Sequence, residues 1–464
     1  MAVLTGTARC TDISSTRFRA LLLAGLVVRL LALPLAGTED VLVWKTWSYG
    51  AVSIGPTHLY GVGGIPPERG VVTWGTRHTT VDYPPVALYE LTLAGTVYRW
   101  FSPEFQDSRW LTVAMKLPAV LAEGLLALLL WRVVRRRHGE RAGRFAASAF
   151  WANPAMILAG SILGYLDPLM ALPAIGAIVA AVEGRPIVAG ALLAIACLTK
   201  AQAVFITPVV ALAVWNAPAG RRAVNATVAA IATALTSAVL VLPFVAIGAW
   251  RNLVQGVGSL LRHDMLSADA ANLWWIVTYA LRAIYAVGDL GTWGAWTMKV
   301  RILGITQIMK LGYPNARPIA TSMVLAAAAW ALWRARRATD LSVLLASAAF
   351  IVHAYFVLGV QVHENHLYLA VPLLAAAAAA RPSLGPVLVA TSAVFALNLY
   401  LFFGLGRGFP LPPRNFTIVD ATVLLSVANV ALLAWHARRY SVAGRLEEAA
   451  NEAAVHLDRG SGDV

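Results

Sequence analysis

The polar side chains that could do chemistry are few and stand at the ends of long apolar runs. Glu39-Asp40 directly follows the first apolar run, Lys200 separates two others, and Gln361-Val-His363-Glu364-Asn365-His366 begins where another ends. A carboxylate at a membrane surface can meet both a lipid headgroup and a hydroxyl acceptor. Histidine and asparagine can donate hydrogen bonds to a phosphate. The pattern therefore indicates acid–base chemistry beside a phosphate group.

Each of these residues also has a structural interpretation. The pair Glu39-Asp40 could instead cap the next helix, and both interpretations stay open. A charge at membrane depth is costly, so a function for Lys200 is favoured over snorkelling. Asp167 could pair with Lys200, but capping of the following helix is favoured. For Trp44 and Trp47 we expect an aromatic belt.

The histidine-rich run does not match a known metal motif. His363-Glu364-Asn365-His366 is one residue short of the zincin pattern H-E-x-x-H, so a zinc protease is not indicated. Phosphate contact is favoured over a solvated helix start.

The composition says which elements must position these residues. Of the 464 residues 59% are hydrophobic and 13% are charged, and the mean hydropathy is +0.68. Soluble domains carry roughly twice that share of charge, so we expect an all-α, polytopic membrane bundle of about twelve spans. The clearest candidates are 18–36, 111–131, 224–247, 318–333, 341–358, 384–403 and 417–435, and the shorter ones 145–160, 168–182, 187–198, 203–215 and 367–380 suit burial within the bundle. Residues 1–440 form one integral-membrane domain, followed by a cytoplasmic tail, 441–464.

The arginines predict the orientation. If Arg17 and Arg19 lie in the cytoplasm, every cytoplasmic loop is basic, both termini are cytoplasmic, and the long loops 37–110 and 249–317 are external. This topology requires 84–101 to be an interfacial helix. No cytoplasmic loop has a glycine-rich turn for a nucleotide, and the net charge of +14 needs no nucleic-acid partner.

Taken together, the motifs resemble a known superfamily. They are Asp40 with Trp44 and Trp47, Asp82-Tyr83-Pro84-Pro85, Asn153-Pro154 with Asp167, Lys200-Ala-Gln202 before Pro208, Asn272-Leu-Trp274, and Gln361-Val-His363-Glu364. In this order they resemble the GT-C glycosyltransferases, which use polyprenyl-phosphate sugars on the outer or lumenal face. Members of the superfamily that the motifs resemble include the dolichyl-phosphate-glucose glucosyltransferases and the bacterial polyprenyl-phosphate-mannose mannosyltransferases.

The resemblance implies roles for individual residues. Asp40 resembles the catalytic base, with Glu39 as its neighbour, and Lys200 and His363 resemble contacts to the donor phosphate. Gln202 is grouped with the phosphate contacts. So is His366, because Asn365 stands where the glucosyltransferases usually have lysine. The expected substrate-loop residues are Asp82, Tyr83, Trp44, Asp167, Asn272, Trp274 and Glu364.

The resemblance also implies a reaction at the extracytoplasmic face of the cell membrane. A single inverting displacement would move a hexose, with mannose favoured by analogy over glucose and arabinose, to a glycan, lipid or peptide acceptor. No cofactor is required, although a divalent metal ion is compatible with the site. The rival interpretations are a secondary transporter, which would show paired broken helices in two similar halves, and a lipid-sugar flippase or scaffold.

Overall fold

The computed structural model describes residues 13–61, 70–217, 221–260, 264–287, 314–416 and 419–460; of these, the side chains of 260, 285–287, 415, 416, 419 and 442–460 are not described. The elements are α1 (Ser15–Ala32), α2 (Glu39–Ile54), η1 (Pro56–His58), β1 (Val71–Trp74), β2 (Arg77–Thr80), α3 (Pro85–Phe101), α4 (Arg109–Trp151), α5 (Pro154–Met156), η3 (Ile157–Leu163), α6 (Asp167–Val182), α7 (Pro186–Thr199), η4 (Ala201–Ile206), α8 (Thr207–Asn216), α9 (Arg222–Ala246), α10 (Trp250–Leu260), α11 (Leu273–Val287), α12 (Ala316–Ala335), α13 (Leu341–Leu358), η6 (Glu364–Leu367), α14 (Ala370–Ala380), η7 (Pro382–Leu384), α15 (Gly385–Phe403), β3 (Asn415–Phe416), β4 (Val419–Asp420) and α16 (Ala421–Gly460).

Helices dominate the fold, and several could cross a membrane. Among the described residues, five helical segments are long and apolar enough by length and composition: Arg109–Trp151, Arg222–Ala246, Leu341–Leu358, Pro382–Phe403 and Ala421–Ser441. They correspond to five of the seven clearest predicted spans, and the other two form α1 and α12. The polytopic helical fold class is thus confirmed, while the count of about twelve spans and the membrane orientation stay predictions.

The long helix α4 is two helices that meet at a glycine. Gly139 has φ +85°, a left-handed conformation that glycine adopts without steric cost. Beyond it the chain turns back, so that the Cα of Gly143 packs beside the Trp131 carbonyl. The predicted spans 111–131 and 145–160 are therefore separated by a reversal inside the basic segment 132–144.

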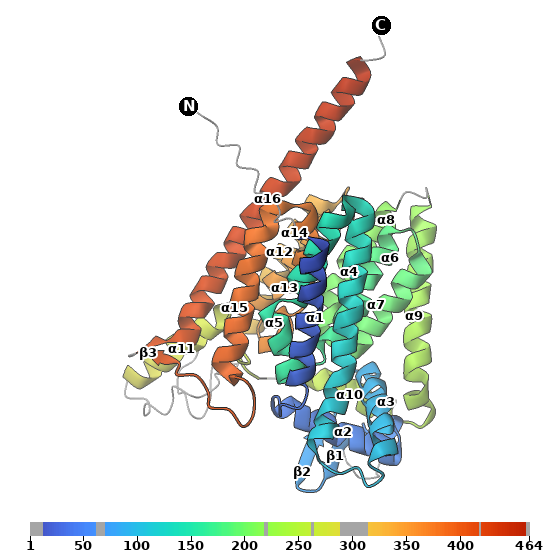
Figure 1. The fold of residues 1–464 in the computed structure, drawn as a ribbon, viewed down its shortest axis with the longest axis vertical. Helices are drawn as coiled ribbons and strands as arrows, with labels where there is room; N and C mark the ends of the chain where they lie inside the picture. Colours follow the sequence, from blue (N-terminus) through green and yellow to red (C-terminus); the bar gives the residue numbers. More distant parts are fainter. Residues whose placement is uncertain are drawn as a thin grey trace.

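The elements of the first long loop gather at one end of the bundle. In Figure 1, α2, the antiparallel hairpin β1–β2 and α3 lie together there, and α16 extends beyond the opposite end. The helix α3 lies with these elements, and its interfacial position stays a prediction. The tail is helical to Gly460.

The aromatic-belt prediction for Trp44 and Trp47 is wrong. Their side chains are 2% and 1% exposed, and both pack edge-on against the ring of Tyr83. Trp44 also donates a hydrogen bond through Nε1 to the carbonyl oxygen of Gly164, 3.2 Å away. These tryptophans attach α2 to the bundle, and both also line the large cavity described below, as was predicted for Trp44.

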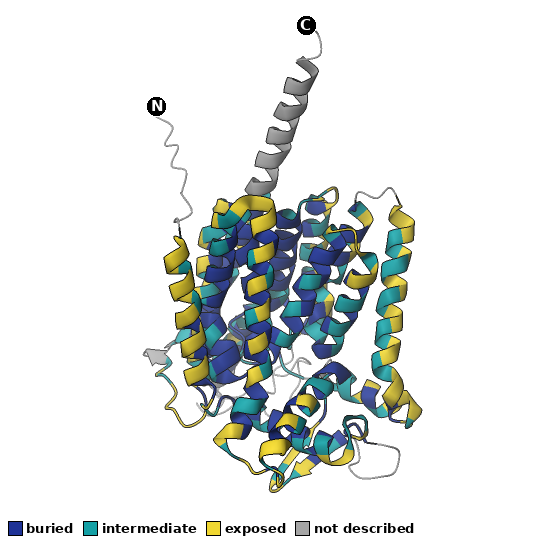
Figure 2. Ribbon diagram, turned by 45° about the vertical axis from the view of Figure 1, so that its right-hand side comes forward, coloured by how far each residue is buried: buried dark blue, intermediate teal, exposed yellow. Residues whose placement is uncertain are grey.

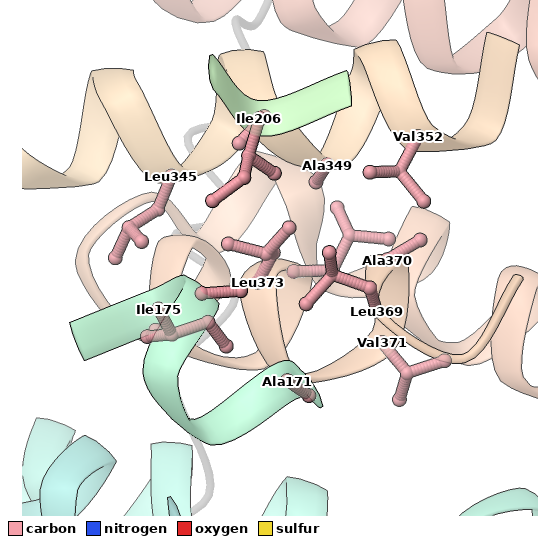
Figure 3. Close-up of a cluster of buried hydrophobic side chains, with 14 of the residues drawn as sticks. Ala171, Ile175, Ile206, Leu345, Ala349, Val352, Leu369, Ala370, Val371 and Leu373 are labelled. Carbon is pink, nitrogen blue, oxygen red and sulfur yellow. The ribbon is translucent and has the colours of Figure 1, made fainter. Parts of the chain in front are cut away.

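The main core is formed by apolar helices in the interior of the bundle. Figure 3 shows Ala171 and Ile175 of α6, Leu345 of α13 and Leu373 of α14 in one cluster. Residues 370–379 of α14 are all buried, as expected for a helix that is apolar on every side. By contrast, α9 stands at the edge of the bundle with mostly exposed and half-buried residues (Figure 2).

A buried ion pair joins α1 to α4 inside the apolar bundle. Arg29 Nε lies 2.7 Å from Glu123 Oε2, and both side chains are fully buried. Arg29 also donates to the Trp151 carbonyl (2.8 Å), and the Tyr368 hydroxyl donates to Glu123 Oε1 (2.8 Å). The Glu123 carboxylate of α4 thus joins α1 and Tyr368, and the Arg29 guanidinium adds the carbonyl at the end of α4. Breaking such a pair leaves an uncompensated charge in an apolar interior.

We therefore predict that Arg29→Met destabilises the protein by about 3–5 kcal/mol. The double variant Arg29→Met/Glu123→Gln should be more stable than Arg29→Met, because no unpaired charge remains. The control is Arg135→Met, which breaks an exposed pair with Glu140 and should cost about 0–1 kcal/mol. Thermal unfolding of the purified protein in detergent measures all three. Equal melting temperatures of Arg29→Met and wild type would contradict the prediction.

Candidate functional site

A cavity of about 1020 Å³ lies where the first long loop meets the bundle. Its walls come from the start of α2, from β2 and the segment after it, from the junction of α7 and η4, from the start of α12, and from 355–366. Polar side chains from all five parts line it, and α12 adds the apolar side chains of Ala320, Val324 and Leu325. The cavity therefore joins a polar region to an apolar one.

Asp40 lies in this cavity, in the first turn of α2. The backbone N–H of Thr38, just before the helix, donates to the Leu163 carbonyl (3.0 Å), which fixes where α2 begins. Burial raises the pKa of Asp40 to about 6, against the lowering effect of Lys200. A carboxylate with this pKa is mostly ionised at neutral pH, yet it accepts a proton more readily than an exposed aspartate.

Glu39 is separated from its neighbour. Its side chain is 77% exposed and lies 2.9 Å from Arg407 Nε, and it is not part of the cavity wall. The first residues of a helix point in different directions, about 100° apart per residue. The structure thus brings only Asp40 of this pair into the cavity.

A second aspartate, Asp82, lines the same cavity together with Tyr83. Burial is the main reason that the pKa of Asp82 is raised to about 6, and the charge of Asp40 raises it further. The ring of Tyr83 packs edge-on against those of Trp44 and Trp47, which also contact each other. The segment after the hairpin thereby places a second titratable carboxyl beside the first.

Lys200 and Asp167 form an ion pair at the cavity wall. Lys200 Nζ lies 2.9 Å from Asp167 Oδ2, with side chains that are 3% and 0% exposed. Asp167 also accepts hydrogen bonds from Gln202 Nε2 (2.9 Å) and Asn365 Nδ2 (3.0 Å). The favoured prediction that Asp167 caps its helix is wrong, because the pairing alternative holds and α6 begins without a side-chain cap.

The ionisable side chains of residues 363–366 differ in exposure and in protonation state. His363 is 36% exposed and its ring lies 3.8 Å from the Glu364 carboxyl. Burial raises the pKa of Glu364 to about 8, so it is largely protonated at neutral pH, and its Oε1 accepts from the Tyr165 hydroxyl (2.6 Å). Burial also holds the pKa of His366 well below its usual value, and its Nδ1 lies 2.9 Å from the Tyr355 hydroxyl. His366 is therefore neutral and cannot supply a positive charge.

Asn272 and Trp274 do not line the cavity but hold the segment that does. Asn272 Nδ2 donates to the carbonyls of Phe356 (3.2 Å) and Gly359 (3.3 Å), and Trp274 Nε1 donates to that of Leu358 (2.7 Å). The backbone of residues 266–268 pairs with that of residues 361–362 through two hydrogen bonds, from Ala268 N–H to the Val362 carbonyl and from Gln361 N–H to the Leu266 carbonyl. Residues 261–263 and 288–313 of the second long loop lie outside the described residues.

The structure adds residues that the sequence analysis missed. Arg317, at the start of α12, lines the cavity, and its Nε has no hydrogen-bond partner among the residues that the structure describes. His78, Thr79 and Thr80 of β2 also line the cavity. Arg317 stands at the end of a long loop with several basic residues, and nothing in its spacing distinguishes it from them. The hairpin strands have four residues each and carry only a weak alternating pattern.

Comparison with known proteins identifies the fold. No family model and no curated protein matches the sequence. ArnT from Cupriavidus metallidurans, solved in complex with undecaprenyl phosphate, is similar in structure, with a TM-score of 0.50 and 15% sequence identity over 93% of this chain and 73% of ArnT. The oligosaccharyltransferase of Archaeoglobus fulgidus was solved tethered to an acceptor peptide. It matches with a TM-score of 0.43 and 14% sequence identity, over 93% of this chain and 55% of the oligosaccharyltransferase chain. The likeness to ArnT shows that this chain has the GT-C fold, as the resemblance in its motifs predicted.

Proposed function

We propose that this chain is a membrane glycosyltransferase that moves a hexose from a polyprenyl-phosphate donor to an acceptor hydroxyl on the extracytoplasmic face. One observation carries the proposal. A single cavity combines a carboxyl with a pKa near 6, Asp40, with the cationic side chains of Lys200 and Arg317 and an apolar wall. A base, a phosphate site and a lipid-facing wall are the three features that such a transfer needs.

The apolar wall suits a lipid-linked donor. Val324 and Leu325 of α12 and Val204 of η4 line the cavity, and Leu325 and Val204 are 63% and 53% exposed. A polyprenyl chain can lie against these side chains while its phosphate reaches Lys200 and Arg317. That ArnT, which shares the fold, was solved with undecaprenyl phosphate supports this donor class.

The chemistry follows as one displacement. Asp40 takes the proton of the acceptor hydroxyl as that oxygen bonds to the anomeric carbon, and the bond from this carbon to the phosphate oxygen breaks. The electron pair leaves with the polyprenyl phosphate, whose charge Lys200, Arg317 and His363 stabilise. Attack opposite the leaving group inverts the anomeric configuration. Gln202 positions this site through Asp167, and Asp82 lies where it can orient the acceptor.

The first test of the proposed function concerns Asp40, the proposed base. Asp40→Asn should lower kcat about 10²–10⁴-fold, because it removes the proton acceptor, and should leave binding of the donor unchanged. The assay is sugar transfer by purified protein from a panel of polyprenyl-phosphate monosaccharides, mannose first, then glucose and arabinose. Glu39→Gln is the matched control and should keep wild-type activity, since Glu39 lies outside the cavity.

The outcomes separate the rival interpretations. Equal turnover by wild type and Asp40→Asn would remove Asp40 from the mechanism and make Asp82 the next candidate. Transport of a lipid-linked or free sugar without any transfer would replace the proposal with the transporter or flippase function.

The second prediction concerns pH. Activity should fall as the pH drops below about 6, because protonated Asp40 cannot accept a proton. Lys200 lowers the pKa of Asp40, so Lys200→Met should raise that pKa and move the acid limb of kcat/KM to higher pH. Asp82 has a similar pKa, and Asp82→Asn is the control that should keep an acid limb. If the acid limb of kcat/KM stayed at the same pH in Lys200→Met, the electrostatic effect of Lys200 on Asp40 would be contradicted.

The third prediction is that transfer does not need a metal ion. Asp167 is paired with Lys200 and Glu364 is largely protonated, and no group of three His, Cys, Asp or Glu side chains is arranged for a metal ion in the described part of the chain. Activity should therefore survive chelation with EDTA. Loss of activity that Mg²⁺ or Mn²⁺ restores would assign Asp40 and Asp82 to a metal instead.

A further inference from the structure

A second cavity, of about 360 Å³, lies between the end of α8, the start of α9 and the end of α12. It is lined by Trp215, Asn216, Arg222, Arg336, Arg337 and Thr339. Its size is at the lower end of the range for small-molecule pockets. The mechanism proposed above uses none of these residues.

The charge of this cavity has one sign. Three of the six lining residues are arginines, none is acidic, and the described ion pairs include none of these three. Arg222 opens α9, whose first turn has no side-chain cap, so the helix dipole adds partial positive charge. All three arginines are exposed, and Arg336 also donates from Nη1 to the Trp333 carbonyl, 2.7 Å away. Like charges so close together favour an anion between them.

The cavity wall is held in place by a residue without charge. Asn216 Nδ2 donates to the carbonyl oxygens of Arg336 and Ala338, each 3.0 Å away. These bonds tie the chain that follows α12 to the end of α8. Arg336 and Arg337, which follow α12, therefore belong to a turn that is already held in place, so part of the ordering cost of binding is already met.

The small cavity lies at the opposite end of α12 from the large one. Arg317, at the start of α12, lines the large cavity, and Arg336 follows its last residue and lines the small one. Twenty residues of helix span about 30 Å, which is about the thickness of the hydrocarbon core. Trp215 and Trp333 are 47% and 57% exposed beside the small cavity, as is typical of the membrane–water boundary.

We propose that this cavity binds the phosphate headgroup of an anionic phospholipid from the leaflet opposite the candidate active site. Guanidinium groups bind phosphate oxygens through paired, charge-assisted hydrogen bonds, and the neighbouring tryptophans lie at headgroup depth. Basic pockets between helices on the cytoplasmic side are suited to such headgroups. The proposal does not depend on the glycosyltransferase function.

The test measures retention of phosphatidylglycerol against phosphatidylcholine by native mass spectrometry of the full-length protein in detergent. Wild type should retain phosphatidylglycerol preferentially. In the triple variant Arg222→Gln/Arg336→Gln/Arg337→Gln the preference for phosphatidylglycerol should fall about a hundredfold. Each arginine that is removed should account for a factor of about five. The control, Arg132→Gln/Arg136→Gln/Arg137→Gln, changes the charge equally at exposed arginines outside the cavity and should behave as wild type.

Two outcomes would overturn the proposal. One is unchanged retention in the folded triple variant or an equal loss in the control, which would indicate a general effect of charge. The other is displacement of the lipid by millimolar inorganic phosphate, which would indicate a site for the free anion. If the triple variant does not elute as a monodisperse species, the three single variants decide, each with the expected fivefold loss.

Discussion

The polar cavity depends on the ion pair between Lys200 and Asp167. Both side chains are almost completely buried, so each is tolerated only because the other is present. Asp167 also accepts hydrogen bonds from Gln202 and Asn365, so one carboxylate fixes the start of α6, η4 and η6 relative to each other. The same pair sets the electrostatics of Asp40, because Lys200 lowers its pKa and Asp167 raises it.

A second buried lysine determines where Asp40 can lie. Lys116 Nζ donates to the carbonyl oxygens of Leu35, Ser161 and Ile162 at 2.6, 3.1 and 2.7 Å. These carbonyls belong to the chain after α1 and to the π-helix η3, whose wide turns leave acceptors without intrahelical partners. By collecting them at one ammonium group, Lys116 brings the α1–α2 junction against the end of η3, and Asp40 follows directly from that junction.

Much of this arrangement could be predicted from the sequence because it follows from length and hydropathy. The apolar segments became helices close to their predicted bounds, and the polar ends of those segments marked Asp40, Lys200 and His363, which all line one cavity. The sequence did not indicate the side of a helix on which a side chain lies, nor which residues distant in sequence become partners. Consecutive residues such as Glu39 and Asp40 point to different sides of a helix, and the partner of Asp167 is 33 positions away.

The tryptophans illustrate the same point. Trp44 and Trp47 have the composition of a membrane-interface belt, but their burial depends on Tyr83, which the hairpin brings back across α2. Arg317 is a related case, since its role depends on where α12 begins after a long loop. Hydropathy predicts that a residue is near the membrane surface, whereas tertiary contacts decide whether it faces lipid, core or cavity.

The carboxyl groups of the cavity show how one site can hold several acids in different states. At neutral pH Asp40 and Asp82, with pKa values near 6, are mostly ionised, whereas Glu364, with a pKa near 8, is mostly protonated. An anionic phosphate that enters beside Lys200 takes up part of the positive potential that keeps the pKa of Asp40 low. Its arrival should therefore raise that pKa and strengthen Asp40 as a base at the moment when the donor is bound. The ion pair that holds the cavity together would in this way also couple donor binding to proton transfer.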